Sequence, residues 1–280
     1  MTTETDTNDY SCKYYNGTMT YVNGSEGEAE ERVTVTIGGD VTSVRSMFHY
    51  CKQLKSVDGT DWFPAENATT NAYCMFFKDE NLETIAGSNN WTLAACKKTG
   101  NMFHGCVKLE EISLASLGLN ECKSTHGMFQ KCTALKNIIG MENWNLSNCE
   151  SCLNMFYECE SIGADKNNAP NFNFTIGSAC KNITNMFARC KSLTSINGER
   201  WDLSGLEKAH NVFGESGLTS ITLMGASIVK LINLGAMRKS SDVTTEFEDT
   251  AKYVCTGNVL GLSFIITGVE SIDNVPSADS

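Results

Sequence analysis

The sequence predicts an α/β solenoid of about seven stacked coils, with a parallel β-sheet, a β-type N-terminal cap and a mixed C-terminal cap. Two observations lead to this prediction. The skeleton Met-Phe-x-x-Cys-x-x-Leu-x-x-Ile returns along the chain, and its copies follow one another at intervals of 28, 27, 26, 27, 31 and 26 residues. A near-constant period of this length is typical of units that bury their apolar side chains only by stacking on one another.

The best-preserved copy of the skeleton begins at Met186 and ends at Ile196. Three copies are degenerate: Asp79 replaces Cys in the second, the fifth lacks the final Ile, and the seventh is shortened and carries Ser216 in place of Cys. The first residues of the seven copies are Met47, Met75, Met102, Met128, Met155, Met186 and Val212.

Residues 1–40 are expected to form an N-terminal arm and a capping strand. The first part is acidic and polar and is rich in Thr, Asn and Gly, a composition that predicts a flexible arm. Residues 32–37 alternate between polar and apolar β-formers and end at two glycines. This pattern predicts a strand that covers the open end of the solenoid.

Residues 41–223 are expected to form the solenoid. In each coil the Leu-x-x-Ile segment predicts a short strand, and strands of successive coils would lie about 4.8 Å apart in a parallel sheet. A glycine turn, a Trp segment and a polar loop follow, and the chain returns through a turn carrying Met-Phe. The three-residue spacing of Phe, Cys and Leu favours a 3₁₀ or α turn. Met and Phe are expected in the core, and Trp62, Trp91, Trp144 and Trp201 at the coil edge.

The longest interval holds an insertion near residues 165–177. An insertion in a single repeat usually becomes a surface loop. Phe172 and Phe174 alternate along this segment and are therefore candidates for a contact loop.

Residues 224–280 break the period and are expected to form a C-terminal cap or docking segment. Apolar residues at helical spacing predict a short amphipathic helix over 227–237. Residues 253–255 and 260–267 are expected to be strands.

Most of the 13 cysteines fall in two columns of the repeat. A column that recurs with the period is explained by packing, and a free Cys behaves as a small buried apolar residue. Thiols in the core are therefore favoured over disulfides or a metal site. Cys149 and Cys152 form the one CxxC pair, which alone is a weak metal signal. Four cysteines lie outside the columns. Cys12, Cys74 and Cys255 are candidates for exposure, and the fourth is Cys152 of the CxxC pair.

The net charge of −11 argues against nucleic acid or an anionic membrane as the partner. No stretch has the apolar length needed to cross a bilayer, and the first residues have no signal-peptide pattern. We therefore expect no membrane insertion.

The chain carries no recognisable catalytic motif. It has neither an HExxH nor a Gly-x-Ser-x-Gly segment, and no phosphate-binding loop. His49 and His104 share one repeat position two coils apart, roughly 10 Å by strand spacing, which is not a ligand spacing. They are interpreted as polar turn residues. The sequence thus predicts neither an enzyme nor a cofactor.

The outward positions of the predicted strands define a candidate binding surface, a concave strip of small, mostly uncharged residues. Such a face suits a hydrogen-bonding partner, either a glycan or a polypeptide, although a merely solvated sheet face is an alternative. The strip residues are Ser56, Asp58, Thr84, Glu111, Ser113, Asn137, Ser195, Asn197, Ser220 and Thr222.

The repeat resembles the BspA-type leucine-rich repeats, in which Met-Phe and Cys mark each unit and a Trp-Asp/Asn-x-Ser segment lies between units. Trp144 to Ser147 and Trp201 to Ser204 match that segment. The resemblance covers residues 41–223. It implies a leucine-rich repeat array used for binding, commonly by adhesins of gut and oral bacteria, and it implies no catalytic residues.

These observations predict a non-enzymatic binding or adhesion module displayed on a surface. The pairing of adhesin-type repeats with the absence of a signal peptide favours a structural or host-recognition component of a phage virion, with the termini contacting other subunits of a larger assembly. The alternative is an intracellular scaffold or effector in the cytoplasm that binds another protein. A cysteine-rich metal or redox protein is a third hypothesis.

Overall fold

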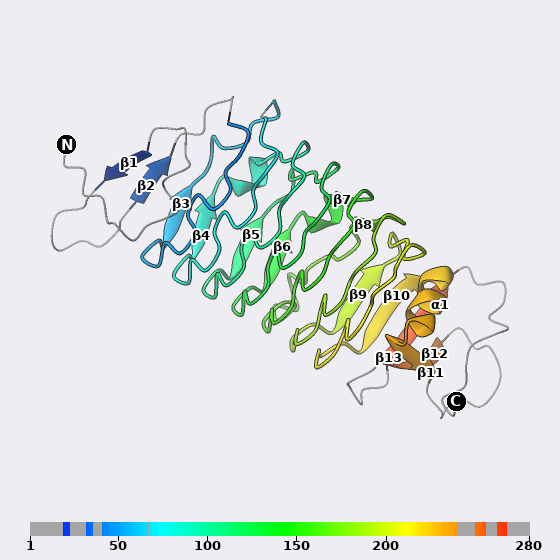
Figure 1. Ribbon diagram of the computed structural model, residues 1–280. Helices are drawn as coiled ribbons and strands as arrows, with labels where there is room; N and C mark the ends of the chain where they lie inside the picture. Colours follow the sequence, from blue (N-terminus) through cyan, green and yellow to red (C-terminus); the bar gives the residue numbers. More distant parts are fainter. Residues whose placement is uncertain are drawn as a thin grey trace.

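The structure is a computed structural model that describes residues 41–66 and 68–236 with their side chains. It also describes the backbone of 19–22, 32–35, 237–239, 250–255 and 262–267. The coils stack side by side along a nearly straight axis (Figure 1). The predicted solenoid is confirmed.

The Leu-x-x-Ile segments form the predicted parallel ladder, but the ladder is not continuous. Strands pair in register with the next coil, so that Val57 faces Ile85, Ile112 faces Ile138, and Ile196 faces Ile221. The fifth coil contributes no strand here because the insertion replaces it. The strands are β3 (Ser56–Asp58), β4 (Thr84–Ala86), β5 (Glu111–Ser113), β6 (Asn137–Ile139), β9 (Ser195–Gly198) and β10 (Ser220–Met224).

A second ladder, which the sequence did not indicate, joins the coils just before the Met-Phe segment. Each coil contributes one polar residue to it, and parallel bridges link them in order: Ser43, Asn71, Lys98, Ser124, Ser151, Asn182 and Lys208. Strands β7 (Asn145–Leu146) and β8 (Thr175–Ile176) add a third, shorter pairing. Every coil is therefore hydrogen-bonded to its neighbours on more than one side.

The Met-Phe segment is not the helical turn that the spacing suggested. Alternate amides bond to different partners: Phe103 N–H donates to Met128 of the next coil at 2.8 Å, while His104 N–H donates to Asn101 at 3.2 Å within its own coil. Asn101 and Gly105 hold positive φ angles of 54° and 77°. Because half of the amides bond to the next coil, this segment is a chain of β-turns rather than a helix.

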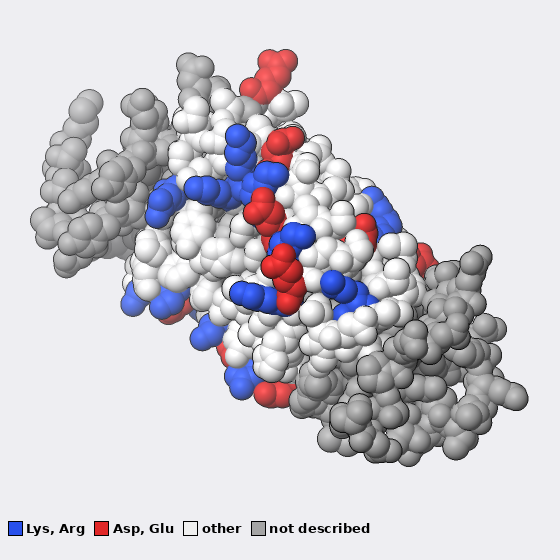
Figure 2. Space-filling view, turned by 45° about the vertical axis from the view of Figure 1, so that its right-hand side comes forward, with Lys and Arg blue, Asp and Glu red and all other residues white. Residues whose placement is uncertain are grey.

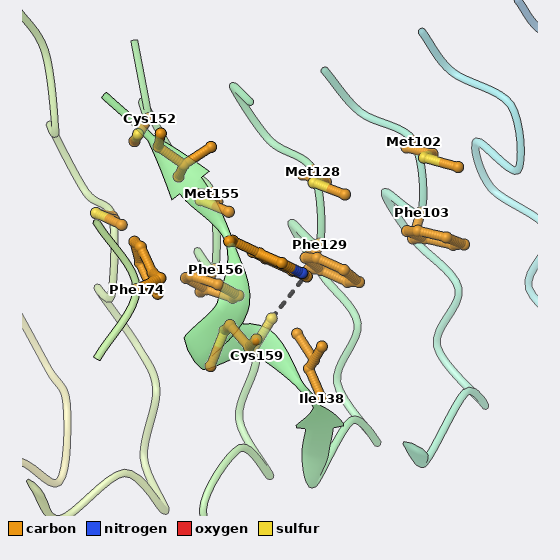
Figure 3. Packing of buried hydrophobic residues seen from close by; sticks show 14 of the residues in the cluster. Met102, Phe103, Met128, Phe129, Ile138, Cys152, Met155, Phe156, Cys159 and Phe174 are labelled. Atoms are coloured by element: carbon orange, nitrogen blue, oxygen red, sulfur yellow. Dashed lines mark hydrogen bonds between the residues drawn. The ribbon is translucent and has the colours of Figure 1, made fainter. Parts of the chain in front are cut away.

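The solenoid core is a stack of aromatic rings. Phe103, Phe129 and Phe156 lie nearly parallel, with ring centroids 5.1 and 5.8 Å apart, and a row of methionines lies beside them (Figure 3). The tryptophans are fully buried against this stack rather than at the coil edge. Trp144, for example, lies 6.2 Å from Phe129 and donates its indole N–H to the Leu114 carbonyl at 3.0 Å.

The cysteine columns lie in the core, as predicted, and their thiols have a bonding role. Cys106 Sγ donates to the Phe76 carbonyl at 3.1 Å, and Cys132 Sγ donates to that of Phe103 at 2.9 Å. Burial raises the pKa of Cys132 to about 12, so this thiol stays neutral. From Cys106 to Cys190, each thiol of this column therefore gives a second hydrogen bond to a carbonyl of the preceding coil that already accepts a backbone N–H of its own turn.

The cysteines outside the columns are also placed. The expectation that Cys74 is exposed is wrong, because its side chain is buried. Cys152 is buried too, with its Sγ 3.8 Å from that of Cys149. Cys12 lies outside the described residues, and Cys255 ends a strand of which only the backbone is described.

Short elements lie at both ends of the array. At the N-terminus, β1 (Met19–Val22) pairs antiparallel with β2 (Arg32–Val35), which is parallel to β3. At the other end, α1 (Gly225–Asn233) is followed by β11 (Met237–Lys239), β12 (Thr250–Cys255) and β13 (Leu262–Thr267). β13 pairs in parallel with β10, so it continues the ladder by one strand. The domain boundaries near residues 41 and 223 stay predictions.

Candidate binding surfaces

The strand strip, defined as the ten outward residues predicted above, lies on the strands as expected, with one exception. Most of its members are exposed or half-buried, but Asn137 is buried, with 4% of its surface exposed. In β6 the neighbouring apolar residue Ile139 takes the exposed position. Asn137 is therefore not available to a partner, although β6 pairs with β5 in the same register as the other strands.

The insertion divides the strand strip. Asn168 donates its amide to the Glu111 carboxylate at 3.0 Å, and Lys166 Nζ donates to the Gly163 and Ser192 carbonyls at 2.9 and 3.3 Å. These contacts reach from the fifth coil toward the third in one direction and toward the sixth in the other. The loop therefore lies across the middle of the strip and leaves a part on either side.

The prediction of a contact loop at Phe172 and Phe174 is wrong for these two side chains. Both are buried: Phe172 packs edge-on against Phe156 and Phe187, and Phe174 lies between Trp144 and Trp201. They fill the place in the fifth coil where other coils have a Trp. The absence of a Trp between Met155 and Met186 was the signal that could have shown this.

In each part of the strip one side-chain oxygen closes a local turn; in the second part, Asn197 Oδ1 accepts the Glu199 N–H at 3.1 Å. In the first part, Asp58 accepts bonds from the Thr60 amide at 3.1 Å and the Thr60 hydroxyl at 2.6 Å. In the second part, Ser195 faces Ser220 across the ladder, and Asn197 faces Thr222. Among the described residues, the hydroxyls of Ser195, Ser220 and Thr222 have no side-chain hydrogen bond. This second part presents polar groups that can accept a partner.

A second surface, which sequence reasoning missed, is the turn edge, defined as the residues two and three positions after each Met. In the later coils it is a charged network. Glu158 lies 2.8 Å from Arg189 and 3.9 Å from Lys131, and Arg189 lies 3.2 Å from Glu215. Burial alone would raise the pKa of Glu158, but hydrogen bonds from Tyr157 and Arg189 and the charge of Lys131 hold this pKa below its usual value. In this half of the turn edge, cations and carboxylates compensate one another.

In the first three coils the turn edge is aromatic and basic instead. Phe77 lies 5.0 Å from His49, 5.7 Å from Tyr50 and 4.7 Å from His104, measured between ring centroids. Lys78 Nζ lies 5.1 Å from the Tyr50 centroid. Figure 2 shows that basic and acidic side chains on one face of the molecule are interspersed in a band, with uncharged surface on either side.

His104 is partly buried in this cluster, and it is not the simple polar turn residue expected. Burial, followed by the charges of Lys131, Lys78 and His126, lowers the pKa of His104 to about 4, although Glu158 acts in the opposite direction. Its imidazole is therefore neutral at pH 7 and lies against the Phe77 ring, tilted by 32°.

This lowered pKa predicts a pH dependence of stability. The unfolded chain binds a proton on His104 near pH 6.5, whereas the folded chain binds it near pH 4. The stability that neutral His104 contributes is thus complete above pH 6.5 and is lost as the pH falls toward 4. The variant His104→Phe carries the residue type that the preceding coil has at this position, Phe77. We expect its melting temperature to fall less than that of the wild type when the pH is lowered from 7.5 to 5. His126, whose pKa burial also lowers, is unchanged in both proteins; equal losses in the two would contradict the assignment.

Within the described part of the chain, no three His, Cys, Asp or Glu side chains come together in a way that could hold a metal ion. The helices of the same residues are too short and insufficiently apolar to cross a membrane.

The stacked coils and their solvent-facing ladder define a repeat solenoid, a class of fold that typically acts as a non-enzymatic binding module. The chain belongs to the family described as "Mycoplasma protein of unknown function, DUF285", which matches residues 42–169 and 120–223, together more than half of the chain. This match supports the resemblance to BspA-like repeats.

A solved structure, the leucine-rich repeat protein from Bacteroides ovatus ATCC 8483, is similar to 75% of this chain over 71% of its own, with 14% identity and a TM-score of 0.24. The fold assignment rests on the hydrogen-bonded coils described above and not on this likeness. No curated protein matches the chain.

Proposed function

We propose that the chain is a surface-displayed binding module that holds a polypeptide partner on the second part of the strand strip. The observation that supports this most directly is the polar row on β9 and β10, in which the hydroxyls of Ser195, Ser220 and Thr222 form no hydrogen bond to the described side chains and Asn197 Oδ1 accepts the Glu199 N–H at 3.1 Å. Ser195 and Asn197 are exposed and Ser220 and Thr222 half-buried, and no charged side chain lies among these four. Hydroxyl and amide groups in such a row can exchange hydrogen bonds with an extended backbone.

Display on a surface is supported by family membership, since BspA-like repeat proteins are often found on cell surfaces. Placement on a virion stays a prediction from the sequence, as does a contact of the termini with other subunits. Proteomics of purified particles, with soluble lysate alongside, tests both against the cytoplasmic scaffold alternative.

The strip can be tested by blocking it. Purified full-length protein is applied to a random peptide array and a glycan array, and the strongest ligand is measured again with Ser195→Arg/Thr222→Arg. The two arginines place bulky charge on the row, so we expect affinity to fall at least about tenfold, or 1.4 kcal/mol. Glu199→Arg, an exposed change just outside the row, is the control and should have little effect.

Each result has a consequence for the proposal. An unchanged affinity in the double variant would exclude the strip as the binding surface. Binding to glycans alone would replace the polypeptide by a carbohydrate, and binding to neither array would contradict the binding function.

A further inference from the structure

The two halves of the turn edge share one geometry but differ in charge balance. In every coil the residue three after the first residue of the skeleton lies at the same place in the turn, with a positive φ of 55–77°. The later coils hold Lys131, Glu158, Arg189 and Glu215 at this position, so each cation has a carboxylate in the next coil. The earlier coils hold Tyr50, Lys78 and Gly105.

Among the residues that the structure describes, no carboxylate lies within ion-pair distance of Lys78. Its ammonium group lies instead 5.1 and 5.7 Å from the ring centroids of Tyr50 and Phe77. A Cβ on Gly105, which has a φ of 77°, would lie 3.2 Å from Lys78 Cγ, so the missing side chain makes room for the lysine stem. The cation is therefore held in a defined place above exposed aromatic surface.

Other charged side chains belong to the same early coils, and one of them, Glu80, acts on Lys78 with the opposite sign. Arg45, in the first coil, lies 5.4 Å above the Tyr73 ring. The charges of Lys78 and Lys131 act together on His104, which lies between them. Two of these three cations, Arg45 and Lys78, form no ion pair within the described residues.

We propose that the aromatic and basic half of the turn edge, formed by His49, Tyr50, Phe77, Lys78 and His104, binds an acidic polypeptide segment. A carboxylate of the partner would form an ion pair with Lys78, as Glu158 does with Arg189 within the chain. The aromatic rings would supply buried apolar contact, a combination of ring and cation that is enriched at protein interfaces. This surface is distinct from the strand strip, which lies about seven residues further along each coil.

The probe is a dye-labelled peptide of alternating Glu and Ala, compared with the same peptide containing Gln. Fluorescence anisotropy with the full-length chain at 50 mM NaCl should show tighter binding of the Glu peptide, and added salt should weaken it. Lys78→Gln should reduce its affinity at least about fivefold, because an interfacial carboxylate loses its partner. Tyr50→Asn should also weaken binding, and Asn tolerates the positive φ of 62° at this position.

Arg189→Gln is the matched control, since it removes a cation from the same column where carboxylates already compensate it. It lies four coils from Lys78, roughly 19 Å by a strand spacing of about 4.8 Å, which is beyond the screening length of about 14 Å at 50 mM NaCl. The change should therefore alter affinity less than twofold. Equal binding of the Glu and Gln peptides, or an unchanged affinity in Lys78→Gln, would overturn the proposal. Preferential binding of polygalacturonate over the Glu peptide would overturn it in favour of an acidic glycan.

Discussion

Replacing Phe129 by alanine is expected to lower the free energy of unfolding by about 3–5 kcal/mol. Phe129 lies in the middle of the aromatic stack, 5.1 Å from Phe103, 5.8 Å from Phe156 and 6.2 Å from Trp144. Its side chain is completely buried. Because domains of this kind have a total stability of only about 5–15 kcal/mol, the change removes a large share of it. Urea titration followed by tryptophan fluorescence measures the loss.

Phe129→Leu is the matched control. It keeps an apolar side chain of similar volume and removes the ring, so we expect less than half of the loss found for alanine. In a stack where each coil contacts only its neighbours, a cavity in a central coil should also make unfolding less cooperative. If alanine and leucine destabilise equally, the cavity is not the origin of the effect.

Replacing Gly140 by alanine is expected to cost about 2–4 kcal/mol, from steric overlap together with backbone strain. Gly140 has a φ of 81°, and an added Cβ would lie 2.3 Å from Cα and 2.4 Å from Cβ of Ala115 in the preceding coil. The obstacle is backbone, which cannot move without shifting the whole coil. Thermal and urea unfolding of the variant measure the loss.

Gly235→Ala separates the two contributions. Gly235 has a similar φ of 67°, but nothing lies within 4 Å of an added Cβ. Its replacement should therefore cost only the strain of a left-handed residue, about 1 kcal/mol. Equal losses at the two positions would show that the close approach of neighbouring coils contributes nothing.

The period of the skeleton was enough to predict the solenoid, because Met, Phe, Cys, Leu and Ile recur wherever a coil needs an inward side chain. It could not predict the conformation of the Met-Phe segment. A three-residue spacing fits both a helical turn and consecutive β-turns, and the difference lies in hydrogen bonds to the next coil. The second ladder was missed for a related reason: residues such as Asn71 and Lys98 have no β-forming pattern and bond through single backbone groups.

The candidate surfaces were harder to predict than the fold. Alternation along a strand placed Ser195 and Asn197 outward correctly, but the same rule failed at Asn137, which is buried in β6. The cluster around Phe77 combines residues from three coils. These residues come into contact only because the turns of the three coils stack on one another in the fold. The shared repeat position of His49 and His104 is visible in the sequence, but the contact of both rings with Phe77 is not.

The inward-facing thiols can report the local opening of each coil that carries one. A thiol such as Cys132 is shielded from reagents while its coil is closed and becomes reactive only when that coil opens. Labelling with a thiol reagent over time, followed by peptide mapping, would therefore give the rate at which each coil from Cys106 to Cys190 opens, without any introduced probe. Because the cysteine recurs in successive coils, the same residue that packs the core also reports on the coil in which it lies. Unfolding of the solenoid can therefore be followed coil by coil in the unmodified chain.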